Sequence, residues 1–283
     1  MRLTFCNFAS EMDYTLNVKG RLMDLSQPKV MGILNVTPDS FFSDSRAQTE
    51  REILVRTREL VNEGAAIVDV GGCSTRPDSV PVSEAEEMQR LRQAFDIIRR
   101  ELPQVVLSID TFRPNVARMA VEEFGVDIIN DVSGGGEEMF RLVSKMGVPY
   151  VLTSCDGTLR DMLLSLAEKV QQLRDLGQKD IILDPGFGFG KTLEQNYEVM
   201  NELERLLVLE LPLLVGVSRK SMIYRRLGGS PADSLNGTTV LNTIALTKGA
   251  SILRVHDVRE AVECVRIVEG VRSKRSKGIC SSK

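Results

Sequence analysis

Short apolar runs alternate along the chain with longer amphipathic stretches. The runs are rich in Val and Ile, and each one ends in polar residues. Because a parallel sheet is covered on both faces, its strands form near-continuous apolar runs instead of alternating ones. The pattern therefore predicts eight buried parallel strands, at residues 30–35, 66–71, 105–110, 126–130, 148–153, 181–184, 213–217 and 251–255.

Between these runs, apolar residues recur with the period of a helix. Ser83 precedes one such stretch and Glu86 follows three residues later, which is the sequence signature of a capping box. Gly64 follows another stretch at the position of a C-cap. We predict helices at residues 49–63, from Ser83 onward, and at 113–124, 137–146, 159–176, 193–207, 236–248 and 258–268.

Eight units of strand and helix in 283 residues predict an α/β fold, the (β/α)8 TIM barrel. A doubly wound sheet is the alternative. Residues 15–24, with Lys19-Gly20 at their centre, predict a short N-terminal hairpin extension. The expected organisation is an extension at 1–29, a barrel at 30–270 and a disordered tail at 271–283, where basic residues show no periodicity.

Composition and charge exclude several classes of protein. The chain has 36 Lys and Arg against 39 Asp and Glu, so its net charge of −3 creates no positive field for nucleic acid. No apolar run approaches the roughly 20 residues that span a bilayer. The five cysteines are odd in number and lack a CxxC pair, which fits a reduced compartment. We expect a cytoplasmic protein that binds neither nucleic acid nor membrane.

Polar side chains close the predicted strands, at the end of the barrel where TIM-barrel active sites lie. Any single Asn or Asp there is explained equally well as a helix cap. Together they indicate a site for a planar, nitrogen-rich heterocycle, since an amidine edge gives two hydrogen bonds to one carboxylate. A metal cage is the weaker alternative, because the chain has one histidine. The residues are Asn35, Asp110, Asn130, Asp184, Arg254 and His256.

Two basic clusters follow the last two predicted strands, at residues 218–221 and 254–257. TIM barrels commonly bind phosphate in these loops, so the clusters predict an anionic substrate. A solvated basic loop is the alternative for residues 218–221. We assign His256 to a pyrophosphate contact, and an acid–base role for it stays open.

Two polar loops, at residues 37–44 and 72–79, have the composition of loops that close over a substrate, although ordinary surface loops share it. Residues 186–192 superficially resemble a nucleotide-binding P-loop. Only three residues separate Gly186 from Gly190, however, where the motif needs four. The glycines are therefore expected to form a tight backbone turn, and nucleotide binding is not expected.

These ordered blocks resemble the dihydropteroate synthase family of pterin-binding TIM barrels. The similarity extends from residue 30 to residue 270. It implies a transferase of folate biosynthesis, the target of sulfonamides, which joins 4-aminobenzoate to 6-hydroxymethyl-7,8-dihydropterin diphosphate and releases pyrophosphate. The matching blocks are residues 32–41, 72–77, 108–111, 129–132, 184–191, 218–221 and 254–258.

The resemblance also implies roles for residues, by position. It implies the cofactor Mg²⁺, with Asn35 as the metal ligand, and a homodimer. The expected catalytic residues are Lys220, Arg254 and His256. The expected pterin and diphosphate site comprises Thr75, Asp110, Asn130, Asp184, Lys220, Arg254 and His256. The expected 4-aminobenzoate pocket comprises Phe41, Thr75, Arg76, Pro77 and Ser221.

An arylamine is a weak nucleophile, so we expect catalysis by stabilisation of the leaving pyrophosphate, with no covalent intermediate and no essential general base. Two rival functions share the fold: a pterin-dependent methyltransferase and a non-catalytic pterin-binding paralogue. The chain also departs from the family pattern. It has Thr153-Ser154 where the family usually has Met-His, and Cys73 where the family usually has Glu.

Overall fold

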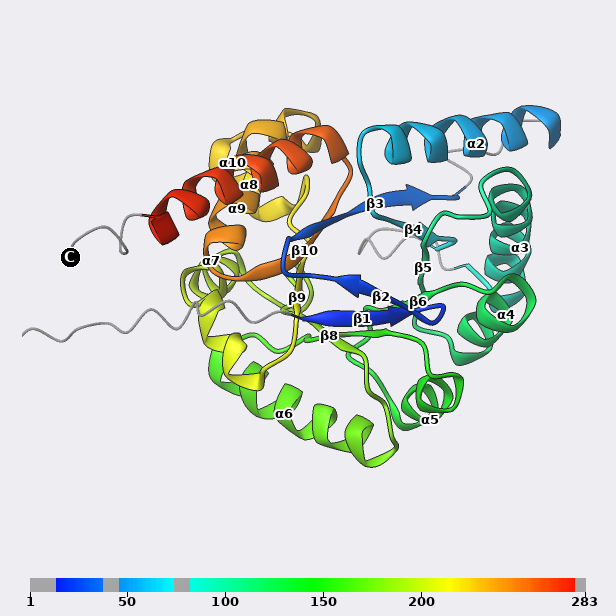
Figure 1. Ribbon diagram of the computed structural model, residues 1–283, viewed down its shortest axis with the longest axis horizontal. Helices are drawn as coiled ribbons and strands as arrows, with labels where there is room; N and C mark the ends of the chain where they lie inside the picture. The colour runs from blue at the N-terminus through cyan, green and yellow to red at the C-terminus, as the bar shows by residue number, and fades with distance from the viewer. Residues whose placement is uncertain (1–13, 38–45, 74–81, 278–283) are drawn as a thin grey trace, which may run out of the picture.

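Parallel strands close into a barrel with helices around its outer face (Figure 1). The computed structural model describes residues 14–37, 46–73 and 82–277. The strand order β10-β3-β4-β5-β6-β7-β8-β9 is that of a TIM barrel, so this prediction is confirmed and the doubly wound alternative is wrong. The barrel strands are β3 (Lys29–Asn35), β4 (Ile67–Gly71), β5 (Leu107–Asp110), β6 (Ile128–Asp131), β7 (Tyr150–Thr153), β8 (Ile181–Asp184), β9 (Leu213–Val215) and β10 (Ala250–Val255).

At least one helix follows each barrel strand. The predicted capping box is present, because Ser83 accepts a hydrogen bond from the Glu86 amide and Glu86 bonds back to the Ser83 amide. The helices are α2 (Arg46–Asn62), α3 (Glu84–Glu101), α4 (Pro114–Phe124), α5 (Glu137–Met146), α6 (Leu159–Asp175), α7 (Leu193–Asn201), α8 (Ser221–Leu227), α9 (Leu235–Thr247) and α10 (Val258–Lys277), with 3₁₀ turns η1 (Leu203–Leu209) and η2 (Pro231–Ser234).

Two helix predictions need correction. The helix predicted at 193–207 ends at Asn201 and continues as η1, where the fully buried Leu203 and Leu206 lie three residues apart, the spacing of a 3₁₀ turn. The helix predicted at 258–268 continues to Lys277 as α10. Lys and Arg are good helix formers and their charge favours a helix C-terminus. Arg272 also donates a 2.5 Å hydrogen bond to the Leu246 carbonyl of α9.

The predicted hairpin is present and covers the amino-terminal end of the barrel (Figure 1). Strands β1 (Thr15–Val18) and β2 (Arg21–Asp24) pair through a two-residue turn, in which Lys19 and Gly20 have φ values of 51° and 73°. Positive φ at both positions matches the right-handed twist of the two strands. Leu16 and Val18 are buried against the barrel interior, so this end is closed and the opposite end carries the site.

The barrel interior has an apolar lower layer and a polar upper layer. Because side chains alternate along a strand, residues two positions apart face the same side. The lower layer is one buried cluster, made of Met31, Ile67, Ile128, Val151, Ile182, Leu214 and Ile252. The polar upper layer lies two residues further along five of these strands. It includes Asp69, Asn130, Thr153, Asp184 and Arg254. Every helix in the described ranges is too short or too polar to span a lipid bilayer.

Candidate active site

Predicted site residues meet in the polar upper layer. Asp110 at the end of β5 lies opposite Asn130 of β6. Arg254 lies on β10, which is separated from β5 by β3 and β4. Its Nη2 donates a 2.5 Å hydrogen bond to Asp110 Oδ2. Asp184 closes β8, and its charge influences the pKa of Lys220, which follows β9. The structure thus brings together side chains that lie up to 144 residues apart.

Asp69 is a member of this layer that sequence reasoning missed. Its Oδ2 accepts a 2.6 Å hydrogen bond from Arg254 Nε and a 3.0 Å bond from Asn130 Nδ2. The side chain is fully buried in the middle of β4. A carboxylate inside an apolar strand is costly unless it is paired, and this was the signal that could have identified it. Asp69 holds the Arg254 guanidinium and the Asn130 amide in fixed positions.

Burial sets the protonation of the layer. It raises the pKa of Asp110 to about 7, although the neighbouring Arg254 opposes the shift. Burial also raises the pKa of Asp184, against the pull of Lys220. It lowers the pKa of Lys220 to about 8, while Asp184 acts in the opposite direction. The Asp110 carboxyl and the Lys220 ammonium therefore change charge near neutral pH.

Lys220 and Arg219 face different partners, so the basic cluster at 218–221 does not act as a unit. Lys220 donates a hydrogen bond to the Phe187 carbonyl, and its Nζ lies 4.5 Å from the centre of the Phe189 ring. Arg219 instead forms two hydrogen bonds with Asp257, of 2.9 and 2.6 Å. Its φ of 55° places a non-glycine residue in the left-handed region directly before Lys220. These contacts exclude the alternative prediction, a basic loop whose side chains contact only solvent.

The glycine-rich segment after β8 folds as a tight turn, as predicted. A Cβ at Gly186 would lie 2.0 Å from the Ser154 carbonyl oxygen, so a side chain cannot fit. Lys191 Nζ donates to the carbonyl oxygens of Ser154, Gly186 and Phe189, each at 3.1 Å. Its ammonium thereby ties the turns after β7 and β8 together. The same turn supplies the Phe187 carbonyl that holds Lys220.

Three other predicted residues border the layer. The His256 amide donates a 3.2 Å hydrogen bond to Ser218 Oγ, which joins the loops after β9 and β10. Ser221 is the first residue of α8 and is partly exposed. Asn35 ends β3, and its Oδ1 lies 3.4 Å from the position that a Cβ on Gly71 would take. The absent side chain of Gly71 keeps space open beside Asn35 and Asp110.

Some predictions lie outside the described residues or lack support. Phe41, Thr75, Arg76 and Pro77 are outside the described ranges, so their roles stay predictions. Within the described ranges, no group of three or more His, Cys, Asp or Glu side chains is arranged to hold a metal ion. The metal cage that was weighed as an alternative has no such protein ligand set there.

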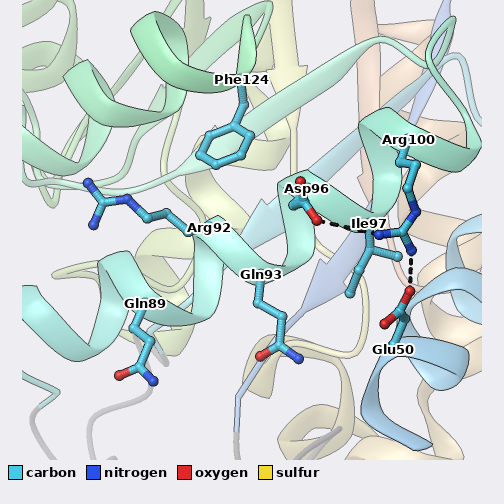
Figure 2. Close-up of a pocket in the computed structure, with 8 residues that line it drawn as sticks. All are labelled: Glu50, Gln89, Arg92, Gln93, Asp96, Ile97, Arg100 and Phe124. Carbon is cyan, nitrogen blue, oxygen red and sulfur yellow. Dashed lines mark hydrogen bonds and ion pairs between the residues drawn. The ribbon is translucent and has the colours of Figure 1, made fainter. Parts of the chain in front are cut away.

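A groove of about 570 Å³ lies outside the barrel and is lined by residues of α2, α3 and α4 (Figure 2). Its cations already have partners: Arg100 is paired with Glu50 and Asp96, and Arg92 forms a 2.8 Å ion pair with Glu123. The groove is therefore a set of satisfied surface ion pairs, separate from the polar upper layer.

Comparison with known proteins agrees with the geometry. Residues 31–256 match the family of pterin binding enzymes. The dihydropteroate synthase of Escherichia coli K12 is 38% identical over 274 residues, covering 91% of this chain and 96% of that protein. The Bacillus subtilis dihydropteroate synthase is 39% identical over 255 residues, covering 87% and 89%.

Solved structures agree as well. The Xanthomonas albilineans dihydropteroate synthase with 4-aminobenzoic acid superposes with a TM-score of 0.85 at 34% identity, covering 92% of this chain and 99% of that one. The match to the family model begins at residue 31 and ends at residue 256. It therefore includes every barrel strand, apart from the first two residues of β3. The chain belongs to the dihydropteroate synthase family of pterin-binding enzymes.

Proposed function

We infer that the chain is a dihydropteroate synthase, a transferase of folate biosynthesis, and that the polar upper layer of its barrel is the active site. It joins 4-aminobenzoate to 6-hydroxymethyl-7,8-dihydropterin diphosphate, giving 7,8-dihydropteroate and pyrophosphate. The observation that carries the site assignment is the convergence of Asp110, Asn130, Asp184, Lys220 and Arg254 in one enclosed layer.

Pterin binding is inferred from side-chain oxygens that accept no hydrogen bond from the described residues. Asp184 Oδ1 accepts a 2.7 Å hydrogen bond from the Gly186 amide, and no hydrogen bond to Oδ2 is present within the described residues. Asn130 Oδ1 is buried, and no described residue donates a hydrogen bond to it. A buried acceptor without a donor is costly, so Asn130 Oδ1 suits an N–H group on the amidine edge of a pterin. Asp184 Oδ2 is available for another N–H group of the same edge. Asp110 and Lys220 complete the proposed pocket.

Leaving-group stabilisation supplies the catalysis. The 4-aminobenzoate nitrogen bonds to the methylene carbon, the carbon–oxygen bond to the diphosphate breaks, and its electron pair goes to pyrophosphate. Positive groups fixed in an enclosed site stabilise this charge without reorganising. Lys220 and Arg254 are the proposed positive groups, and His256 is a proposed contact of the pyrophosphate. The attacking nitrogen loses its proton to solvent water after the bond forms, so no general base or covalent enzyme intermediate is required.

The residues present fit a bound Mg²⁺. Among the described residues, the side chain of Asn35 has no hydrogen-bond partner, and its Oδ1 faces the space kept open by Gly71. Mg²⁺ commonly takes one or two protein oxygens and completes its shell with water and substrate phosphates. When bound, it would neutralise charge on the diphosphate. Asn35 is the proposed protein ligand, and Ser221 is a proposed contact of 4-aminobenzoate in the loop after β9.

The assay that tests the function measures pyrophosphate release from the pterin diphosphate, with and without 4-aminobenzoate. We expect release coupled to dihydropteroate, identified by mass, and loss of most turnover when EDTA removes Mg²⁺. Restoration of turnover by added Mg²⁺ is the control. Pterin binding without product would instead support the non-catalytic paralogue, and methyl transfer to a corrinoid protein would support the methyltransferase.

We expect kcat/KM for the pterin diphosphate to be greatest between about pH 7 and about pH 8. Below its pKa of about 7, Asp110 is protonated and loses an acceptor site. Above its pKa of about 8, Lys220 is neutral and no longer stabilises pyrophosphate. Steady-state rates from about pH 5.5 to about pH 9.5 test this profile. In Lys220→Met the fall at high pH should disappear, and its persistence would contradict the assignment to Lys220.

A further inference from the structure

Thr153 is a buried polar residue in the active-site layer that the proposed chemistry has not used. It ends β7, and Val151, two residues earlier, belongs to the apolar cluster inside the barrel. The alternation of side chains therefore directs Thr153 into the interior as well. Its side chain is fully buried, and within the described ranges its Oγ1 has no hydrogen-bond partner.

The neighbours of Thr153 on both sides are proposed pterin contacts. It lies directly opposite Asp184 on β8, while Val151 lies opposite Asn130 on β6. Thr153 is thus a diagonal neighbour of Asn130 across the β6–β7 pair. Asn130 Oδ1 is a second buried atom without a partner. Two unsatisfied polar groups therefore flank the same part of the layer.

The methyl group of Thr153 has a packing role that its hydroxyl does not share. Cγ2 lies 3.0 Å from the position of a Cβ on Gly186, so the methyl group contacts the turn after β8. A buried hydroxyl without a partner is destabilising, and most such groups in native proteins are satisfied by water or by a ligand. Packing alone would favour valine, which has the same shape and no hydroxyl to satisfy.

We propose that Thr153 contributes to pterin recognition in this chain, by donating a hydrogen bond from its hydroxyl to a ring nitrogen or carbonyl oxygen of the bound pterin. The proposal rests on the proposed function. Its neighbours in the layer supply unused acceptors, Asn130 Oδ1 and Asp184 Oδ2, for the N–H groups of the ring. The Asn130 amide also gives an N–H to Asp69. The Thr153 hydroxyl therefore supplies a donor beside them for an acceptor atom of the same heterocycle.

The test compares Thr153→Val with Thr153→Ser, using 6-hydroxymethylpterin as the probe in calorimetric titration. Valine keeps the shape and removes the hydroxyl, so we expect the Kd for the pterin to rise about 5- to 10-fold. The melting temperature of the free protein should stay equal or increase, because an unsatisfied group is gone. Serine keeps the hydroxyl and should retain the Kd within about 2-fold. The KM for 4-aminobenzoate should not change in Thr153→Val.

Ser144→Ala is the matched control. Ser144 Oγ is also buried without a partner, but it lies on α5, outside the barrel. Its removal should leave the Kd for the pterin unchanged. A purely structural role for Thr153 predicts the opposite result, a lower melting temperature with an unchanged Kd, and that result would overturn the proposal. Failure of the unmodified protein to bind the pterin would overturn the proposed function, and the assignment of Thr153 with it.

Discussion

Replacing Arg254 with alanine is expected to lower kcat/KM for the pterin diphosphate by about 10²-fold or more. One lost charge contact to the departing pyrophosphate costs about 3 kcal/mol in the transition state. The side chain is 15% exposed and is held by Asp69 and Asp110 at 2.6 and 2.5 Å. Steady-state kinetics with the pterin diphosphate varied at saturating 4-aminobenzoate measures the effect.

The same replacement should destabilise the protein. It leaves Asp69 and Asp110 in a buried layer without the cation that pairs them, and removing one partner of a buried ion pair costs about 3–5 kcal/mol. Burial opposes the charge of Arg254, but the two carboxylates outweigh this effect and raise its pKa. Urea unfolding at pH 7 tests the loss.

Two further variants separate catalysis from folding. Arg254→Lys keeps a positive charge and should recover part of the stability, while its turnover stays low because the guanidinium fork is lost. Arg259→Ala removes an exposed arginine from α10, whose nearest carboxylate lies 3.7 Å away, and should change neither property. Near-native kcat/KM in a folded Arg254→Ala enzyme would refute the role of Arg254.

Asp184→Asn is expected to raise the Kd for the pterin and to lower kcat/KM by about 10- to 100-fold. A charge-assisted hydrogen bond contributes about 1.5–3 kcal/mol, and the amide cannot accept two hydrogen bonds from an amidine edge as a carboxylate does. Its oxygen still accepts from the Gly186 amide, so the turn after β8 should persist. Calorimetric titration with 6-hydroxymethylpterin measures the Kd.

Asp131→Asn is the matched control for this change. Asp131 is also buried at the end of a barrel strand, but it follows Asn130 and so faces outward, where it accepts a 2.8 Å hydrogen bond from the Tyr150 hydroxyl. This variant should lose stability and keep its Kd for the pterin. An equal loss of binding in both variants would show that Asp184 acts through folding alone. Asp184→Asn should also lower the pKa of Lys220 further, since Asp184 raises it.

The architecture of this protein follows from patterns that can be recognised in its sequence. Eight apolar runs predicted the bounds of the barrel strands to within two residues, because strands that are covered on both faces are apolar at nearly every position. Polar residues at strand ends also identified Asp110, Asn130, Asp184 and Arg254, since in this fold all strand ends of one kind meet at one face. The capping box of α3 and the hairpin at Lys19-Gly20 were also predicted correctly, because each depends on a few neighbouring residues.

The pairing of those residues, in contrast, depends on how the strands are arranged in space. Asp69 had no sequence signal beyond a charge within an apolar run, and its partner Arg254 lies 185 residues away. Arg219 looked like a substrate-binding cation, but Asp257 on the next loop neutralises it. Nothing in the sequence distinguishes Thr153 from other residues at strand ends. Its position opposite Asp184 depends on the register of β7 and β8. Charge and spacing are local properties of a sequence, whereas partners, burial and protonation arise when distant strands are brought into register.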